Sequence, residues 1–198
     1  MHHAATLVDS VANGRGDRRM AIRAGAVLFV IALTAAAAQF SVPLPFTAVP
    51  FTFQPMIVLL GGLALGGRLG MTSQLLYLLA GVAGLPVFAA SATLPPGALR
   101  LLGPTGGYLM AYPFAALLTG YLAERGLDRR YITSVRAMAA GLGVIYVSGA
   151  GWLAAVSGTG FAAALAAGVL PFVLADLLKL LAAAGIVPAF WKLLGRAG

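Results

Sequence analysis

The chain has 198 residues, of which 61% are hydrophobic and only 9% are charged, and it carries a formal net charge of +8. A soluble domain has about a quarter charged residues, so this composition excludes an ordinary water-exposed globular surface and indicates an integral membrane protein of one domain. The sequence has no cysteine, which excludes disulfides and thiolate metal sites. His2 and His3 lie at the extreme N-terminus, where a metal role is not expected.

The first 20 residues are polar and include Arg15, Arg18 and Arg19. No small-residue cleavage site closes the apolar run that follows, so residues 1–20 are predicted to be a cytoplasmic tail rather than a signal peptide. The first membrane span is predicted over residues 21–40. Residues 41–55 are apolar but contain four prolines, which remove backbone donors and fix φ, so a loop is expected there.

Two short helices are predicted next, over residues 56–66 and 69–84. The first would be only about 17 Å long, well short of a hydrocarbon core of about 30 Å. Irregular backbone is tolerated at membrane depth only where protein or a cavity shields it. The proline-rich loop is therefore expected to reach inward to meet this short helix, which is a first sign of a binding pocket.

Three further spans are predicted over residues 104–124, 137–156 and 171–194. A second apolar loop occupies residues 85–103, and a charged loop occupies residues 125–136. Residues 161–168 are read either as a separate short helix or as the start of the last span. The predicted fold is all-α: residues 21–198 form a bundle of six transmembrane helices, with both termini on the same side.

The basic residues are distributed unequally between the two sides of this bundle. One side has eleven of them, and the opposite loops have one, Arg100. The basic side comprises Arg15, Arg18, Arg19, Arg23, Arg68, Arg125, Arg129, Arg130, Arg136, Lys192 and Arg196. By the positive-inside rule, both termini are predicted to be cytoplasmic, in a multi-pass protein of the cytoplasmic membrane.

Other function classes find little support in the sequence. A basic chain can bind nucleic acid, but here the basic residues lie between apolar runs rather than on one folded face. The apolar region has no histidine, no cysteine and no phosphate-binding G-x-x-x-x-G-K-[ST] loop. We therefore expect neither an enzyme nor a bound cofactor or metal.

Asp176 and Lys179 are the only charged residues in the interior of a predicted span. Three residues apart, they share one face of the helix, and each charge costs about 2.5–3.5 kcal/mol at a helix centre. We interpret them as a polar floor for an external ligand; the alternative is an ion pair that only neutralises itself. Arg100 lies in an otherwise apolar loop, where it is either solvated or binds a carboxylate in bidentate fashion.

Several segments, taken in order, carry a family resemblance. They are residues 43–54 (PLPFTAVPFTFQ), 59–66 (LLGGLALG), 84–88 (GLPVF), 103–108 (GPTGGY) and the Asp176-x-x-Lys179 pair. Together they resemble the BioY family, the biotin-binding subunits of energy-coupling-factor transporters. The chain departs from the family pattern at Pro55, where threonine is common, and after Phe88, where the loop is poorer in glycine.

The resemblance implies a six-helix bundle with an outward-facing pocket under two extracellular loops, which binds biotin without enzymatic chemistry. It also implies a transmembrane coupling subunit and two ATPase subunits as partners. Contact with the coupling subunit would be made by small residues spaced A-x-x-x-A on the first helix, which Ala32 and Ala36 match. Homo-oligomerisation is left open.

The chemistry of biotin matches the polar residues singled out above. Asp176 would accept from a ureido N–H, Lys179 would donate to the ureido carbonyl, and the ligand carboxylate would lie near Arg100. The reverse orientation, with Lys179 on the carboxylate, also remains open. The apolar walls are expected to come from Phe46, Val49, Phe88 and Tyr108.

Three alternatives to biotin transport stay open at this point. The chain could serve as the substrate-binding component for a different vitamin or small molecule. It could be a membrane enzyme such as a lipid-modifying transferase, although no catalytic cluster is seen. It could also be a purely structural subunit, in which case the Asp176–Lys179 pair would need a protein partner.

Overall fold

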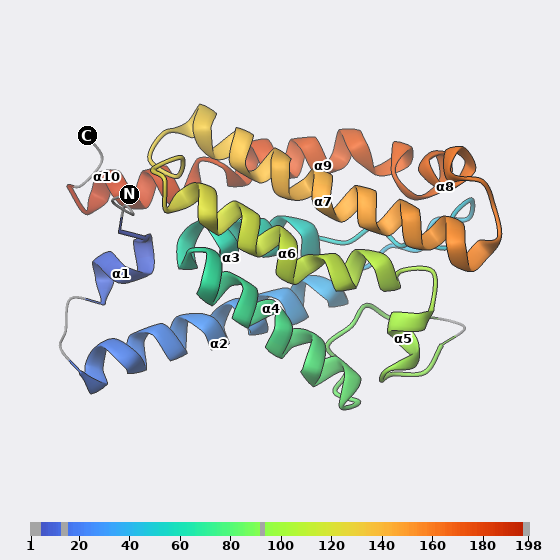
Figure 1. Cartoon of the computed structure of the whole chain (residues 1–198), viewed down its shortest axis with the longest axis horizontal. Coiled ribbons are helices and arrows are strands. Elements are labelled where there is room, and N and C mark those ends of the chain that lie inside the picture. Colours follow the sequence, from blue (N-terminus) through green and yellow to red (C-terminus); the bar gives the residue numbers. More distant parts are fainter. Residues whose placement is uncertain (1–4, 13–15, 92–93, 196–198) are drawn as a thin grey trace.

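Residues 5–12, 16–91 and 94–195 are described by a computed structural model, and they form ten α-helices (Figure 1). Within these residues the only β-structure is an isolated antiparallel bridge between Val42 and Phe51. The helices are α1 (Leu7–Val11), α2 (Asp17–Gln39), α3 (Gln54–Leu65), α4 (Gly67–Val82), α5 (Leu99–Leu102), α6 (Gly106–Ala123), α7 (Tyr131–Ser157), α8 (Phe161–Gly168), α9 (Leu170–Ala183) and α10 (Ile186–Leu193). His2, His3, Arg15 and Arg196 lie outside the described residues.

The all-helical fold class is confirmed. Three described stretches are long and apolar enough to cross a membrane by length and composition, namely Asp17–Gln39, Tyr131–Ser157 and Leu170–Leu193. The last of these consists of α9 and α10 placed end to end. Helix α3 is apolar but only 12 residues long, as the sequence predicted for the helix that follows the proline-rich loop.

Several helix boundaries differ from the prediction. Helix α2 begins at Asp17 and α7 at Tyr131, so both helices extend into segments that were predicted to be polar tail or loop. The predicted last span is interrupted after Ala183, because Pro188 has no N–H to bond the carbonyl of Ala184 and its ring would clash with it. Residues 161–168 form a separate helix, α8, which decides between the two readings of that segment.

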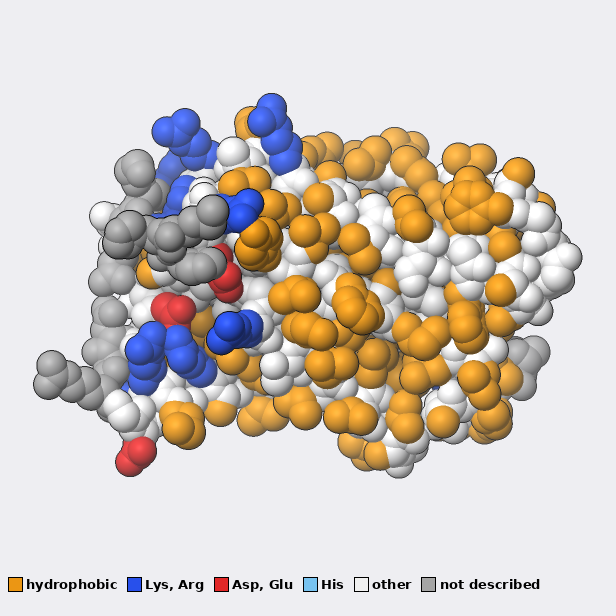
Figure 2. Space-filling model, viewed as in Figure 1, with side chains coloured by type: hydrophobic (Ala, Val, Ile, Leu, Met, Phe, Trp, Pro, Cys, Tyr) orange, Lys and Arg blue, Asp and Glu red, His pale blue; other side chains and the backbone are white. Residues whose placement is uncertain are grey.

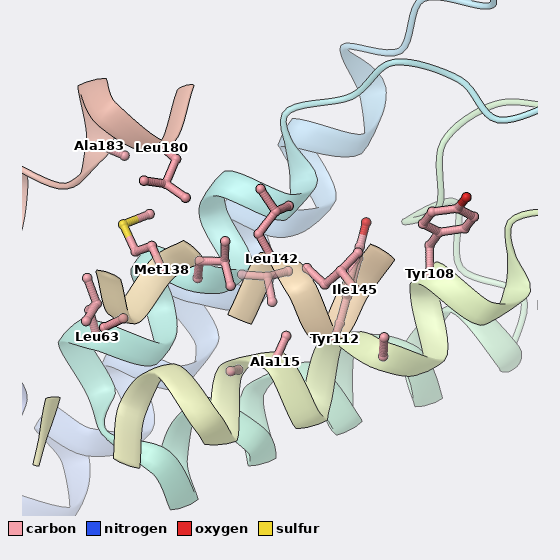
Figure 3. Close-up of a cluster of buried hydrophobic side chains, with 14 of the residues drawn as sticks. Leu63, Tyr108, Tyr112, Ala115, Met138, Leu142, Ile145, Leu180 and Ala183 are labelled. Atoms are coloured by element: carbon pink, nitrogen blue, oxygen red, sulfur yellow. The ribbon is translucent and has the colours of Figure 1, made fainter. Parts of the chain in front are cut away.

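The core lies between α3, α6, α7 and α9. Figure 3 shows Leu63, Ala115, Leu142 and Leu180 from these four helices directed toward one another. Glycine allows the helices to approach closely: a Cβ at Gly62 would lie 2.7 Å from the carbonyl oxygen of Ala116. The glycine pair at 61 and 62 therefore serves helix packing, as is common in membrane proteins.

The two ends of the bundle differ in character. Helices α1 and α10 lie at the same end (Figure 1), and Lys and Arg side chains gather there, while hydrophobic side chains cover most of the remaining face (Figure 2). Part of the predicted N-terminal tail packs on this end, where Val8 is buried and Arg129 donates to the carbonyl oxygen of Ala5 at 2.7 Å. The two long loops, described over residues 40–53 and over 83–91 and 94–98, lie toward the other end.

Candidate ligand-binding site

A cavity of about 320 Å³ lies where the two long loops meet the helices. The loops contribute Pro43, Thr47, Ala48, Val49, Pro50, Thr52, Phe88, Ala89, Ala90, Ser91 and Leu94. The helices and their immediate flanks contribute Gln54, Pro55, Arg100, Pro104, Thr105, Tyr108, Leu109, Tyr112, Ile145, Tyr146, Gly168, Phe172 and Asp176. Most of these side chains are apolar or aromatic, with few polar groups among them, which is typical of a small-molecule site.

Asp176 is the acidic group of this cavity. It projects from α9 and is 7% exposed. Its Oδ1 accepts from the Lys179 ammonium at 2.9 Å, and its Oδ2 accepts from the Tyr146 hydroxyl at 2.8 Å. Each carboxylate oxygen can accept a further hydrogen bond, so Asp176 is both oriented by protein groups and able to receive a donor from a ligand.

Lys179 lies behind Asp176 and does not itself line the cavity. Its ammonium group donates to the carbonyl oxygen of Thr52 at 2.7 Å and lies 3.4 Å from the centroid of the Phe51 ring. Asp176 and Lys179 share one face of α9, as predicted, and form a buried ion pair, which was the alternative to ligand contact by both residues. The same lysine also fixes the end of the first loop, which sequence reasoning did not anticipate.

Arg100 is buried against the second loop rather than solvated. It is 9% exposed, lines the cavity and donates to the carbonyl oxygen of Ala89. Its Nε has no hydrogen-bond partner within the described residues, and burial lowers the pKa of its guanidinium group. A desolvated cation with an unused donor is costly unless an anion meets it, so this position suits a carboxylate.

Of the four residues predicted to form the apolar walls, three line the cavity and one does not. Val49, Phe88 and Tyr108 are buried and line the cavity. Phe46 is not brought to the cavity, because it lies inside a turn closed by Thr47 N and the Leu44 carbonyl and its side chain is 64% exposed. The prediction for Phe46 is corrected accordingly: Thr47 and Val49 line the cavity, and Phe46 is exposed outside it.

Sequence reasoning missed several lining residues, of which Tyr146, Tyr112 and Gln54 are the most informative. Gln54 is buried, and its amide nitrogen donates to the Tyr77 hydroxyl at 2.6 Å. The Tyr77 hydroxyl in turn donates to the carbonyl oxygen of Val87 at 3.0 Å, so this chain of bonds ties α3 to the second loop. A tyrosine within an apolar span, such as Tyr146, is a usable signal, because its buried hydroxyl needs a partner.

The two alanines proposed for a partner contact lie on α2, away from the cavity. Ala32 and Ala36 are both exposed on that helix. Their spacing of four residues places them on one face, so the face is open to another helix.

Comparison with solved structures finds a protein of similar fold. The chain superimposes with a TM-score of 0.82 on a crystal structure described as the S-component for biotin from an ECF-type ABC transporter, at 24% identity and covering 90% of this chain and 95% of that one. This chain thus has the same fold as that structure. The sequence profile of the BioY family matches residues 13–196, and the chain belongs to this family.

Relatives of known name support the assignment over most of their length. A probable biotin transporter BioY of Pyrococcus horikoshii is 43% identical over 153 residues, which is 77% of this chain and 86% of the relative. The biotin transporter BioY of Thermotoga maritima is 37% identical over 175 residues, covering 88% and 97% of the two chains. That of Rhizobium etli is 36% identical over 164 residues, covering 79% and 81%.

Proposed function

We propose that this protein binds extracellular biotin and carries it across the cytoplasmic membrane as the substrate-binding component of an ECF-type ABC transporter. The observation that carries the proposal is one cavity that presents both the oriented carboxylate of Asp176 and the Nε–H donor of Arg100, which has no partner among the residues that the structure describes. Biotin has ureido N–H donors and a carboxylate, so it complements both groups. The membership in a family of transporters also agrees with the expectation that the chain is not an enzyme.

The size and lining of the cavity support a ligand of this kind. Its volume of about 320 Å³ falls at the lower end of the range of about 300–1,000 Å³ for small-molecule pockets. Val49, Phe88 and Tyr108 offer apolar surface to the thiophane ring and the valerate chain. Lys179 and Tyr146 hold the carboxylate of Asp176 from outside and from within the cavity wall respectively, so that Asp176 can accept from a ureido N–H.

The membrane arrangement follows the charge distribution. We place six spans in the bilayer: α2, α3 together with the first loop, α4, α6, α7 and the α9–α10 pair. The basic end with both termini faces the cytoplasm, and the two loops cover an outward-facing cavity. The proposed partners are a transmembrane coupling subunit and two ATPase subunits.

The exposed face of α2 is the proposed contact with the coupling subunit, because small residues let a partner helix approach closely. Replacing Ala32 and Ala36 by tryptophan should weaken co-purification with that subunit while biotin binding is retained. Intact assembly in this variant would move the contact elsewhere.

The deciding experiment is equilibrium binding of radiolabelled biotin to the detergent-purified protein. Saturable binding at one site per chain is expected, and unlabelled biotin should displace the label while other vitamins do not. Displacement by a different vitamin at lower concentration would reassign the cargo. A monodisperse preparation that binds none of these compounds would favour the purely structural subunit.

A further inference from the structure

A second hollow lies at the basic end of the bundle, between α2 and the beginning of α4. Its volume is about 540 Å³, and none of its lining residues belongs to the biotin cavity. The residues that matter here are Arg19, Arg23, Met20, Val27, Leu69 and Thr72. The hollow therefore has two guanidinium groups at one end and apolar side chains beyond them.

The two arginines are only partly neutralised. Arg19 and Arg23 lie one turn apart on α2 and both contact Asp9 of α1, Arg23 through Nε at 3.0 Å and Arg19 at 3.5 Å. One carboxylate thus faces two guanidinium groups, which leaves one net positive charge. The Arg19 and Arg23 side chains are 47% and 36% exposed, and each guanidinium has five N–H donors. Donors are left over for an anion that enters the hollow.

The apolar part lies deeper along the same helix. Val27 follows Arg23 by one turn, about 6 Å further along α2, and is 7% exposed in a small core cluster on which Leu69 packs. Met20 is 70% exposed beside Arg19. Anion-binding groups at the charged end of a bundle, followed by apolar surface toward its middle, match the headgroup and the acyl chain of a lipid.

We propose that this hollow binds one anionic phospholipid, with its phosphate on Arg19 and Arg23 and an acyl chain along Met20, Val27 and Leu69. Free phosphate would leave the apolar surface unused. Anionic lipids also attract basic residues at the cytoplasmic surface of a membrane, and Figure 2 shows that basic side chains gather at this end. The leaflet assignment rests on the proposed orientation, but the lipid site does not depend on biotin binding.

The test compares phosphatidylglycerol with phosphatidylcholine of the same acyl chains, added to the detergent-purified protein. Native mass spectrometry should retain one phosphatidylglycerol per chain, and this lipid should raise the melting temperature more than phosphatidylcholine does. The R19Q/R23Q variant should bind phosphatidylglycerol about tenfold more weakly or worse, because charge-assisted hydrogen bonds are lost. R125Q/R130Q, which removes two arginines that do not line the hollow, is the matched control and should bind it normally.

Asp9→Asn should change the affinity for phosphatidylglycerol in the opposite direction. This substitution removes the carboxylate that competes for the two arginines, so phosphatidylglycerol should bind more tightly. The melting temperature measured without lipid is the folding control. Equal losses in both double variants, or equal retention of both lipids, would overturn the proposal. So would an R19Q/R23Q protein that keeps phosphatidylglycerol but fails to assemble with the coupling subunit, since the hollow would then be a protein interface. Biotin binding should stay unchanged in R19Q/R23Q.

Discussion

The ammonium group of Lys179 lies 2.7 Å from the carbonyl oxygen of Thr52 and 2.9 Å from Oδ1 of Asp176. One side chain therefore joins the carboxylate of the cavity to the end of the first loop. That loop is closed on itself by the bridge between Val42 and Phe51, and its inner residues cover the cavity. The position of the loop and the charge of the binding site consequently depend on the same lysine.

Replacing Lys179 by methionine should weaken biotin binding and lower the stability of the protein. The apolar stem beside Phe51 is kept, but the bond to Thr52 and the pairing of Asp176 are lost. We expect biotin affinity to fall about ten- to hundredfold, the equivalent of one hydrogen bond to a charged group, and the melting temperature to drop because Asp176 stays buried without its cation. Lys192→Met, which changes an exposed lysine on α10, is the control in the same binding assay. Equal affinities in the two variants would show that Lys179 has no part in binding.

The double variant D176N/K179M separates an ion pair from a binding site. Neither residue is left as an unpaired buried charge, so the protein should fold well. If the pair only neutralises itself, biotin binding should survive; if it holds the ureido group, as we propose, little or no binding should remain. Asp176→Asn alone should already lower the affinity in a monodisperse preparation. A folded double variant that binds like the parent would remove both residues from the site.

Tyr146→Phe probes the orientation of Asp176 without changing any charge. The ring remains in place, but the hydroxyl that donates to Oδ2 is removed. We expect biotin affinity to fall about tenfold, since a hydrogen bond to a carboxylate is lost. Tyr121→Phe removes an exposed hydroxyl that pairs with Arg125, and its biotin dissociation constant should equal that of the parent. A matching loss in Tyr121→Phe would mark the effect as nonspecific.

Arg100→Met tests which end of biotin faces the second loop. The parent protein should bind biotin more tightly than biotin amide, because only biotin brings a carboxylate to the guanidinium group. In Arg100→Met the dissociation constants of the two ligands should become similar, mainly through weaker binding of biotin. If Lys179→Met removes the preference for biotin instead, the ligand lies in the reverse orientation.

The sidedness of the bundle can be measured with single cysteines, since the chain has none. A cysteine at Ala98 should react with an impermeant thiol reagent added to intact cells, and one at Arg125 should react only after lysis. The cysteine is placed at Arg125 rather than at the neighbouring Gly126, because the φ of +84° at Gly126 would strain any other residue. Labelling at Arg125 alone would reverse the proposed topology.

Local patterns gave the most reliable predictions. Apolar runs and prolines located most of the helices, and a separation of three residues was enough to bring Asp176 to Lys179. The position of Phe46 was wrong because it depends on a turn within an irregular loop, where no periodicity indicates direction. The contact of Tyr146 with Asp176 joins residues 30 apart on different helices, and the bond from Lys179 to Thr52 spans 127 residues. Such contacts depend on how the helices pack, which the sequence pattern does not specify.

The glycines between α3, α4 and α6 set limits on how proteins of this kind can diverge. A methyl group at position 120 would overlap the backbone of Gly66 and Gly67, and one at position 62 would press on the carbonyl oxygen of Ala116. Larger residues at these glycine positions would force the helices apart, so few substitutions are tolerated there. The stretch from Thr47 to Pro50 lines the cavity from a loop, away from these glycine contacts. Inheritance of the glycine contacts, with replacement of cavity-lining residues outside them in the loops and on the helices, is thus the simplest evolutionary route by which such a chain could acquire a new cargo.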